Sequence, residues 1–306
     1  MKQVKWGNTG KTVPAVALGC MRITGLSVKE AAVFLDSALE QGVNFFDHAD
    51  IYGGGECEKI FGEAVKELKA DRETLFIQSK CGIVPGVMFD SSKEHILEAV
   101  DGILKRLDVE YLDSLLIHRP DLLVEPEEVA EAFDKLETSG KVRYFGVSNE
   151  NPMEMELLKK YVKQPLCANQ LQFGLVHTGM LNQQLEVNMT TPGAFDRDGS
   201  LMDYCRLHDI TIQAWSPFRS LDQRRSFIGN ETYPEINAKL EELAEKYGET
   251  PMTIAAAWIL RHPADIQILS GSMKAERLKE VCRACEIRLT KEEWYGLYLA
   301  AGNILP

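Results

Sequence analysis

The feature that most constrains the fold is a regular alternation of short apolar segments and amphipathic helical segments. Eight segments carry the apolar and β-branched residues typical of buried strands. Helical patterns lie between them; one begins with an S-x-x-E capping box at Ser27 and ends at Gly42. Such alternation favours an α/β fold with a parallel sheet, and eight units predict a closed (β/α)8 TIM barrel. The predicted strands are residues 15–21, 44–49, 75–80, 112–120, 142–149, 167–174, 210–217 and 266–272.

Three stretches fall outside the eightfold count. An N-T-G turn within residues 3–19 predicts an N-terminal β-hairpin. Residues 218–235 are expected to form a long loop after the seventh strand. Extra helices are predicted after that strand and at the C-terminus, where residues 290–302 have a helical pattern. No linker, repeat or low-complexity tract divides the chain, so residues 1–306 are predicted to form a single barrel domain.

Charge and cysteine content exclude several functional classes. The net charge of -12 disfavours nucleic acid as a partner, because a phosphate backbone repels an acidic chain, and it weakly disfavours an anionic membrane surface. No apolar run reaches the roughly 18 residues of a membrane span, and the first residues lack the apolar centre of a signal peptide. The seven cysteines are scattered, which predicts a reduced, cytoplasmic protein. Cys282 and Cys285 lack the partners of a zinc site, so no metal is predicted.

Polar residues gather at the predicted ends of the strands. In an α/β barrel, the active site lies at the carboxyl ends of the strands. Asp47 ends the second strand, Tyr52 follows it, Lys80 ends the third and His118 ends the fourth. These ends are expected to meet at one rim. The later strands add Ser148 and Asn149, Asn169 and Gln170, Trp215 and Ser216, and residues 270–272.

The first four of these residues form a coherent proton-donating group. A tyrosine hydroxyl has an unperturbed pKa of about 10 and is a poor donor at neutral pH without a nearby cation. Lys80 would supply the cation, and Asp47 would pair with that buried ammonium group. His118 would hydrogen-bond the same substrate oxygen. This arrangement predicts a proton donor directed at a carbonyl oxygen that becomes an alkoxide.

The order of these motifs resembles the aldo-keto reductases. The matching stretches are D-H-A-D-I-Y, S-K, L-L-I-H, G-V-S-N and N-Q, and the agreement extends over almost the whole chain. The resemblance implies a barrel that uses NAD(P)H to interconvert aldehydes or ketones and alcohols. It implies catalytic roles for Asp47, Tyr52, Lys80 and His118, with Tyr52 as the general acid.

The same resemblance implies a cofactor site along the rim. Arg277 favours NADPH over NADH, because a guanidinium matches a phosphate. Gly271 stands where the better-studied reductases often have a lysine, and Lys274 is a possible substitute. The segment around Met21 and Arg22 is also atypical. The expected cofactor-binding residues are Met21, Arg22, Asp47, Ser148, Asn149, Gln170, Trp215, Ser216, Phe218, Gly271, Ser272, Arg277 and Glu280.

Other interpretations of these residues remain open. Ser148 and Asn149 could cap the helix that follows, Trp215 could be a core residue, and Arg277 could be a solvated helix charge. His48 and Asp50 are expected to have packing or solvent roles.

Two other functional classes compete with carbonyl reduction. A metal-dependent hydrolase would need a second cluster of ligands at the strand ends, and none is found. A nucleotide-sensing binding module with little turnover is the main alternative. The expected partner of a reductase is a small-molecule carbonyl substrate, with Val84, Val87, Met88 and Phe89 as candidates for an apolar pocket. Neither the substrate nor the oligomeric state follows from the sequence.

Overall fold

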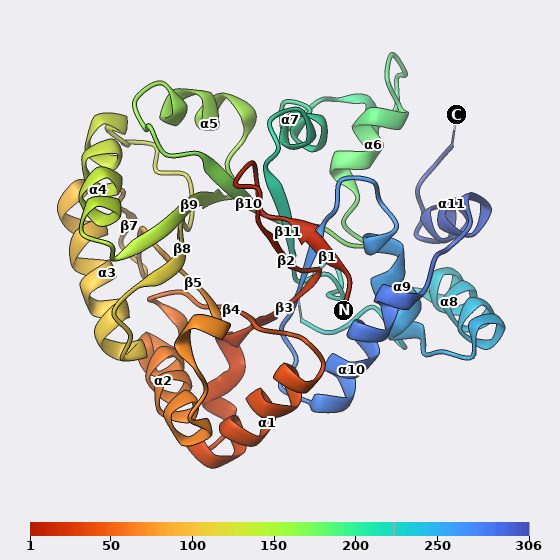
Figure 1. The fold of residues 1–306 in the computed structure, drawn as a ribbon. Coiled ribbons are helices and arrows are strands. Elements are labelled where there is room, and N and C mark those ends of the chain that lie inside the picture. Colours follow the sequence, from red (N-terminus) through yellow and green to blue (C-terminus); the bar gives the residue numbers. More distant parts are fainter. Residues whose placement is uncertain (223, 306) are drawn as a thin grey trace.

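Eight parallel strands close into a barrel and confirm the predicted (β/α)8 fold (Figure 1). The structure is a computed structural model that describes residues 1–222 and 224–305. Two positions of the predicted domain, 223 and 306, lie outside the described residues, and position 223 belongs to the predicted loop of 218–235. Consecutive barrel strands are neighbours, and every barrel pairing is parallel. The barrel strands are β3 (Val16–Gly19), β4 (Phe45–Asp47), β5 (Phe76–Cys81), β8 (Leu112–Ile117), β9 (Val142–Ser148), β10 (Leu166–Gln172), β11 (Thr211–Trp215) and β12 (Gln267–Ser270).

Helices surround the strands and begin at recognisable caps (Figure 1). Ser27 and Glu30 form the predicted capping box of α1. Asn151 caps α5 by accepting hydrogen bonds from two backbone amides, so the interpretation of Ser148 or Asn149 as this cap is wrong. The helices are α1 (Val28–Glu40), α2 (Glu56–Leu68), α3 (Lys93–Leu107), α4 (Pro126–Thr138), α5 (Pro152–Lys159), α6 (Gly179–Leu185), α7 (Leu201–Leu207), α8 (Pro234–Tyr247), α9 (Pro251–Leu260), α10 (Ala275–Arg283) and α11 (Lys291–Ala300).

The predicted N-terminal hairpin packs across the amino-terminal end of the barrel. Its strands, β1 (Gln3–Lys5) and β2 (Thr12–Pro14), are antiparallel, and they lie over the middle of the ring in Figure 1. Trp6 in the turn is fully buried and contacts the rings of Phe45 and Phe76, with centroids 5.5 and 5.2 Å away. Those two rings stack 4.4 Å apart at the start of neighbouring strands. This aromatic cluster closes the end of the barrel opposite the predicted active site.

The additions to the barrel are largely as predicted. Two helices, α8 and α9, lie between β11 and β12, and α11 lies near the C-terminus. Between Phe218 and α8 the described chain is irregular, as expected for the loop. One difference is residues 81–92, where β6 (Ile83–Val84) and β7 (Met88–Phe89) form a short hairpin whose tip is exposed. Among the described residues, no helix is long and apolar enough to cross a bilayer.

Candidate active site

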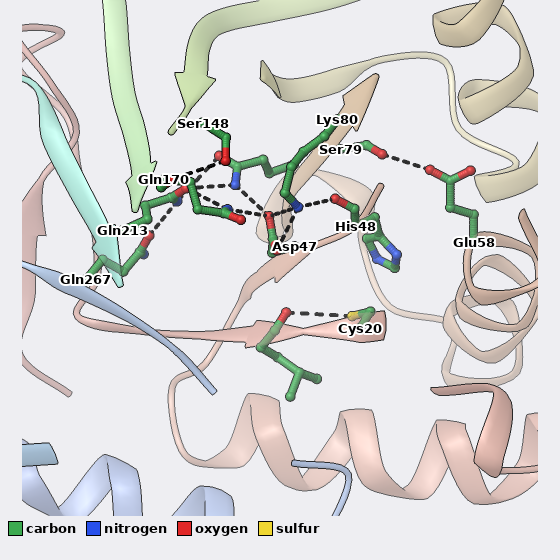
Figure 2. Close-up of polar contacts among 12 residues, drawn as sticks. Cys20, Asp47, His48, Glu58, Ser79, Lys80, Ser148, Gln170, Gln213 and Gln267 are labelled. Atoms are coloured by element: carbon green, nitrogen blue, oxygen red, sulfur yellow. Dashed lines mark hydrogen bonds and ion pairs between the residues drawn. The ribbon is translucent and has the colours of Figure 1, made fainter. Parts of the chain in front are cut away.

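A buried ion pair forms the centre of the predicted site (Figure 2). Lys80 Nζ lies 2.8 and 2.9 Å from the two carboxylate oxygens of Asp47, and both residues are almost completely buried. The Lys80 ammonium also donates to the backbone carbonyl of His48. Burial alone would lower the pKa of Lys80, but the neighbouring Asp47 and Tyr52 raise it above its usual value. The predicted Asp47–Lys80 contact is therefore present, and the lysine is held in its charged form.

Tyr52 reaches this pair from a glycine-rich turn. The turn of 52–55 follows β4 and leads directly into α2, and Gly53, Gly54 and Gly55 all have positive φ angles. Glycine has no steric penalty in this region of backbone space. Lys80 Nζ lies 5.0 Å from the Tyr52 ring centroid. Burial raises the pKa of Tyr52, and the positive charge of Lys80 with its hydrogen bond opposes that rise without reversing it.

His118 lies beside Tyr52 at the end of β8. The two ring centroids are 5.9 Å apart in an edge-on arrangement. Burial, together with the positive charges of Lys80 and Arg119, lowers the pKa of His118 to about 3. Its Nδ1 is buried and has no hydrogen-bond partner among the described residues. The imidazole is therefore neutral at physiological pH and has hydrogen-bonding capacity left for a ligand.

The outward face of β5 holds α2 in place and contributes no residue to the proton-donating group. Ser79 Oγ donates to Glu58 at 2.8 Å, and the other oxygen of Glu58 accepts from Arg106 Nε at 2.7 Å. His48 is fully buried with its ring edge-on to Phe61, which agrees with the predicted packing role. Burial lowers the pKa of His48 to about 3, so it packs as a neutral ring. No cluster of three or more His, Cys, Asp or Glu residues within the described chain has the geometry of a metal site.

Backbone in the left-handed region occurs at the ends of β9 and β11, the two strands that flank β10. Asn149 after β9 has φ 60°, and Ser216 after β11 has φ 49°. Asn149 accepts a hydrogen bond from Trp215 Nε1 at 3.2 Å and donates to Ser148 Oγ at 2.8 Å. Strained backbone of this kind concentrates at ligand-binding sites. Trp215 is half-buried, with the Arg119 guanidinium 5.8 Å from its ring centroid, so it is not a plain core residue.

Gln170 points into the barrel. Its Nε2 donates to Asp47 Oδ1 and to Gln213 Oε1, each at 3.1 Å. Both N–H groups of the Gln170 amide therefore have protein partners, and its Oε1 is the atom left to accept a hydrogen bond. A ligand amide could contact Gln170 only by donating to this oxygen.

A cationic region lies at the junction of β3, β11 and β12. Arg22 donates to the backbone carbonyl of Gly271 at 2.8 Å. Burial and the positive charge of Arg219 lower the pKa of Arg22. Two guanidinium groups that act on each other electrostatically favour an anion in their vicinity. A side chain at position 271 would be constrained, because a Cβ there would lie 3.0 Å from Arg22 Nη1.

The remaining predicted cofactor residues lie around this junction. Met21 is exposed in the short helix after β3, and Phe218 is half-buried in the loop after β11. Ser272 Oγ accepts from the backbone amide of Lys274 at the start of α10. Arg277 is exposed on that helix, and no ion pair joins it to another residue of the described chain. Glu280 lies one turn further along, with its backbone carbonyl bonded to Thr253.

Three functional candidates were missed by the sequence analysis. Gln78, Gln213 and Gln267 are fully buried inside the barrel and hydrogen-bond one another below Asp47. A signal was available, because Gln78 lies two residues before Lys80 and Gln213 two before Trp215. Residues i and i+2 of a strand face the same side.

Comparisons with known proteins agree with this architecture. The family model of the Aldo/keto reductase family matches residues 15–297. An uncharacterized oxidoreductase, YcsN, from Bacillus subtilis is 36% identical over 89% of this chain and 88% of its own length. A 6-dehydroglucose reductase from Novosphingobium aromaticivorans is 31% identical over 98% of this chain and 96% of its own.

A solved structure shares the fold. The aldo/keto reductase of Klebsiella pneumoniae, crystallised with NADP and acetate, superposes with a TM-score of 0.78, covering 100% of this chain and 97% of that one at 24% identity. Together with the family match over nearly the whole barrel, these relatives assign the chain. It belongs to the aldo/keto reductase family of NAD(P)H-dependent oxidoreductases.

Proposed function

We propose that this chain uses NADPH to reduce a small aldehyde or ketone to an alcohol, with Tyr52 as the proton donor. The observation that carries the proposal is the buried Asp47–Lys80 pair in contact with a half-buried phenol. Burying an ion pair costs free energy, and an apolar pair of similar size would stabilise the fold at least as well. A buried, charged lysine next to a tyrosine at a strand end is better explained by a catalytic role than by a contribution to stability.

The residues present fit a nicotinamide nucleotide. At one end, Asn149 accepts from Trp215 Nε1 and donates to Ser148, and Gln170 has an acceptor oxygen left; the indole ring of Trp215 would stack on a planar group. At the other end, Arg22 feels the positive charge of a second arginine, Arg219, and this concentration of positive charge suits a pyrophosphate. NADPH, when bound, supplies the hydride. Arg277 would contact the 2′-phosphate from its exposed position on α10, which is the basis for proposing NADPH over NADH.

The chain's own groups would handle the proton. Neutral His118 donates a hydrogen bond to the carbonyl oxygen and orients it beside the Tyr52 hydroxyl. As the oxygen becomes an alkoxide, it takes the hydroxyl proton of Tyr52. The resulting phenolate is stabilised by the Lys80 ammonium, which Asp47 holds in place. The raised pKa of Tyr52 keeps its hydroxyl protonated at neutral pH until the alkoxide develops.

The test is loss of NADPH absorbance with a panel of aldehydes, ketones and quinones. Tyr52→Phe should lose at least about 100-fold in kcat, the scale of general-acid catalysis, while still binding NADPH. Tyr247→Phe is the matched control, because its hydroxyl also has a hydrogen bond, to Glu293 at 2.6 Å, far from the site. NADPH binding without turnover on any substrate would support the nucleotide-sensing module instead. Turnover that survives Tyr52→Phe would remove Tyr52 as the donor.

A further inference from the structure

The interior of the barrel just below Asp47 is polar. Barrel interiors of this fold are normally filled with branched apolar side chains. Here Gln78, Gln213 and Gln267 are all fully buried there. Burying an amide without a partner costs several kcal/mol, so each must be hydrogen-bonded to be tolerated. The layer therefore needs an explanation beyond packing.

The three glutamines form a connected chain of hydrogen bonds. Gln78 Nε2 donates to Asp47 Oδ1 at 2.7 Å and to Gln213 Oε1 at 2.9 Å. Gln213 Nε2 donates to Gln267 Oε1 at 2.8 Å, and Gln267 Nε2 donates to the Pro14 carbonyl at 2.6 Å. The chain thus runs from Asp47 to the last residue of the N-terminal hairpin, and Figure 2 labels Asp47, Gln213 and Gln267 along it. Each link leads from one strand to another.

Gln213 is the branch point of this chain. Its Oε1 accepts from Gln78 at 2.9 Å and from Gln170 at 3.1 Å. Both of those glutamines also donate to Asp47 Oδ1. One carbonyl oxygen therefore orients the two amides that hold the carboxylate. The same oxygen fixes which atom Gln170 presents to a ligand.

The geometry of Asp47 depends on these donors. Its Oδ1 accepts from Gln78, Gln170 and Lys80, whereas Oδ2 accepts from Lys80. Rotation of the carboxylate would break two amide hydrogen bonds, so the group is locked with both oxygens toward the lysine. A hydrogen bond to a charged group contributes about 1.5–3 kcal/mol, enough to select one orientation.

We propose that Gln78, Gln213 and Gln267 are positioning residues that couple the proton-donating group to the cofactor-binding residue Gln170. This inference rests on the proposed function. Gln78 holds Asp47, and through it Lys80, in register beneath Tyr52. Gln213 ties the same carboxylate to Gln170, and Gln267 anchors Gln213 to the hairpin at the far end of the barrel.

The proposal predicts a specific pattern in three methionine variants, since methionine has nearly the shape of glutamine without its polar atoms. Gln78→Met should lower kcat about tenfold with less than a twofold change in the carbonyl KM. Gln213→Met should lower kcat and also weaken NADPH binding several-fold, measured by fluorescence titration. The double variant should be little worse than Gln213→Met alone, because the two residues act as one unit. Gln267→Met should show the effects of Gln213→Met at reduced size.

Gln164→Met is the matched control for lost stability. Gln164 is also buried, and its Nε2 donates to two carboxylates, Asp134 and Glu137, each at 2.8 Å. It lies just before β10, at the amino-terminal end of the strand. This variant should lower the melting temperature without changing kcat or NADPH affinity.

The outcomes separate this inference from the proposed function. If the native chain reduces carbonyls and the folded Gln78 and Gln213 variants keep kcat and NADPH affinity within twofold, the positioning role is refuted and the reductase activity stands. Fully additive losses in the double variant would also refute the coupling. If the native chain binds NADPH without turnover, a weakened affinity in Gln213→Met but not in Gln164→Met supports the layer's role in binding. Failure to bind NADPH at all overturns both proposals.

Discussion

Removing the lysine of the buried ion pair should strongly destabilise the fold. Lys80→Met would leave Asp47 in the barrel interior without its cation, which now lies 2.8 Å away. Breaking a buried pair on one side typically costs 3–5 kcal/mol. Gln78 and Gln170 would still donate to the carboxylate, which partly offsets the loss. We therefore expect a decrease of about 3–4 kcal/mol in the free energy of unfolding at pH 7.

Reversible urea unfolding, followed by circular dichroism, would measure this decrease. The matched control is Lys163→Met. Lys163 also lies 2.8 Å from a carboxylate, that of Asp134, but its side chain is 79% exposed, against 0% for Lys80. Water screens an exposed pair, so the control should unfold at nearly the native urea concentration. The two ion pairs have the same distance and differ in the burial of the lysine, so the difference between the two losses of stability reports the effect of burial.

A second variant distinguishes the loss of charge balance from the loss of packing. Asp47→Asn combined with Lys80→Met removes both charges and leaves the amide donors. This double variant should be more stable than Lys80→Met alone, because no uncompensated carboxylate remains buried. The reasoning is refuted if Lys80→Met unfolds like the Lys163 control. It is also refuted if the double variant is less stable than Lys80→Met by the full cost of a second independent substitution.

Three further predictions test other parts of the structure. Burial and the negative charge of Glu154 raise the pKa of Glu150 to about 8, so this carboxyl binds a proton in the folded state that the unfolded chain releases above about pH 4.3. Stability should therefore fall between these values as pH rises, and Glu150→Gln should flatten the fall in melting temperature from pH 5 to pH 8. Gly146→Ala would place a methyl group 2.6 Å from a backbone carbonyl of β10 and should lower the free energy of unfolding by about 1–3 kcal/mol in a urea titration. Arg277→Met should raise the Kd for NADPH while leaving that for NADH unchanged, and equal effects on both would place Arg277 outside the 2′-phosphate contact.

The fold could be predicted because local signals agreed with the global architecture. Helix caps such as Ser27 and the glycine after the helix divide the chain into units, and each unit begins with an apolar strand. Once the strands are placed, the barrel topology brings their carboxyl ends together at one rim, independently of the length or packing of the intervening helices. This is why Asp47, Lys80 and His118, far apart in sequence, could be assigned to one rim.

The features that were missed depend on information that no single segment carries. Asn151 caps α5 in place of Ser148 or Asn149, and the left-handed backbone of Asn149 (φ 60°) that precedes this cap could not be located from the sequence. The electrostatic interaction of Arg22 with Arg219 joins the short helix after β3 to the loop after β11, and the relative placement of these two segments is set by tertiary contacts. The direction of the pKa shift of Tyr52 could not be predicted for a similar reason. The cation was predicted, but the degree of burial that outweighs it comes only from packing.

The glutamine layer shows where the limit of sequence reasoning lies. Strand periodicity places Gln78 on the same face as Lys80, but it does not say which residues of other strands lie opposite. In the barrel, Gln78 pairs in register with Asp47, and Gln213 pairs with both Gln170 and Gln267. A shift of one residue between any two of these strands would turn one partner outward and leave an amide unsatisfied. The same hydrogen bonds that orient Asp47 therefore also penalise other registers. The glutamine layer that positions the site would therefore also fix the register between the barrel strands that carry it.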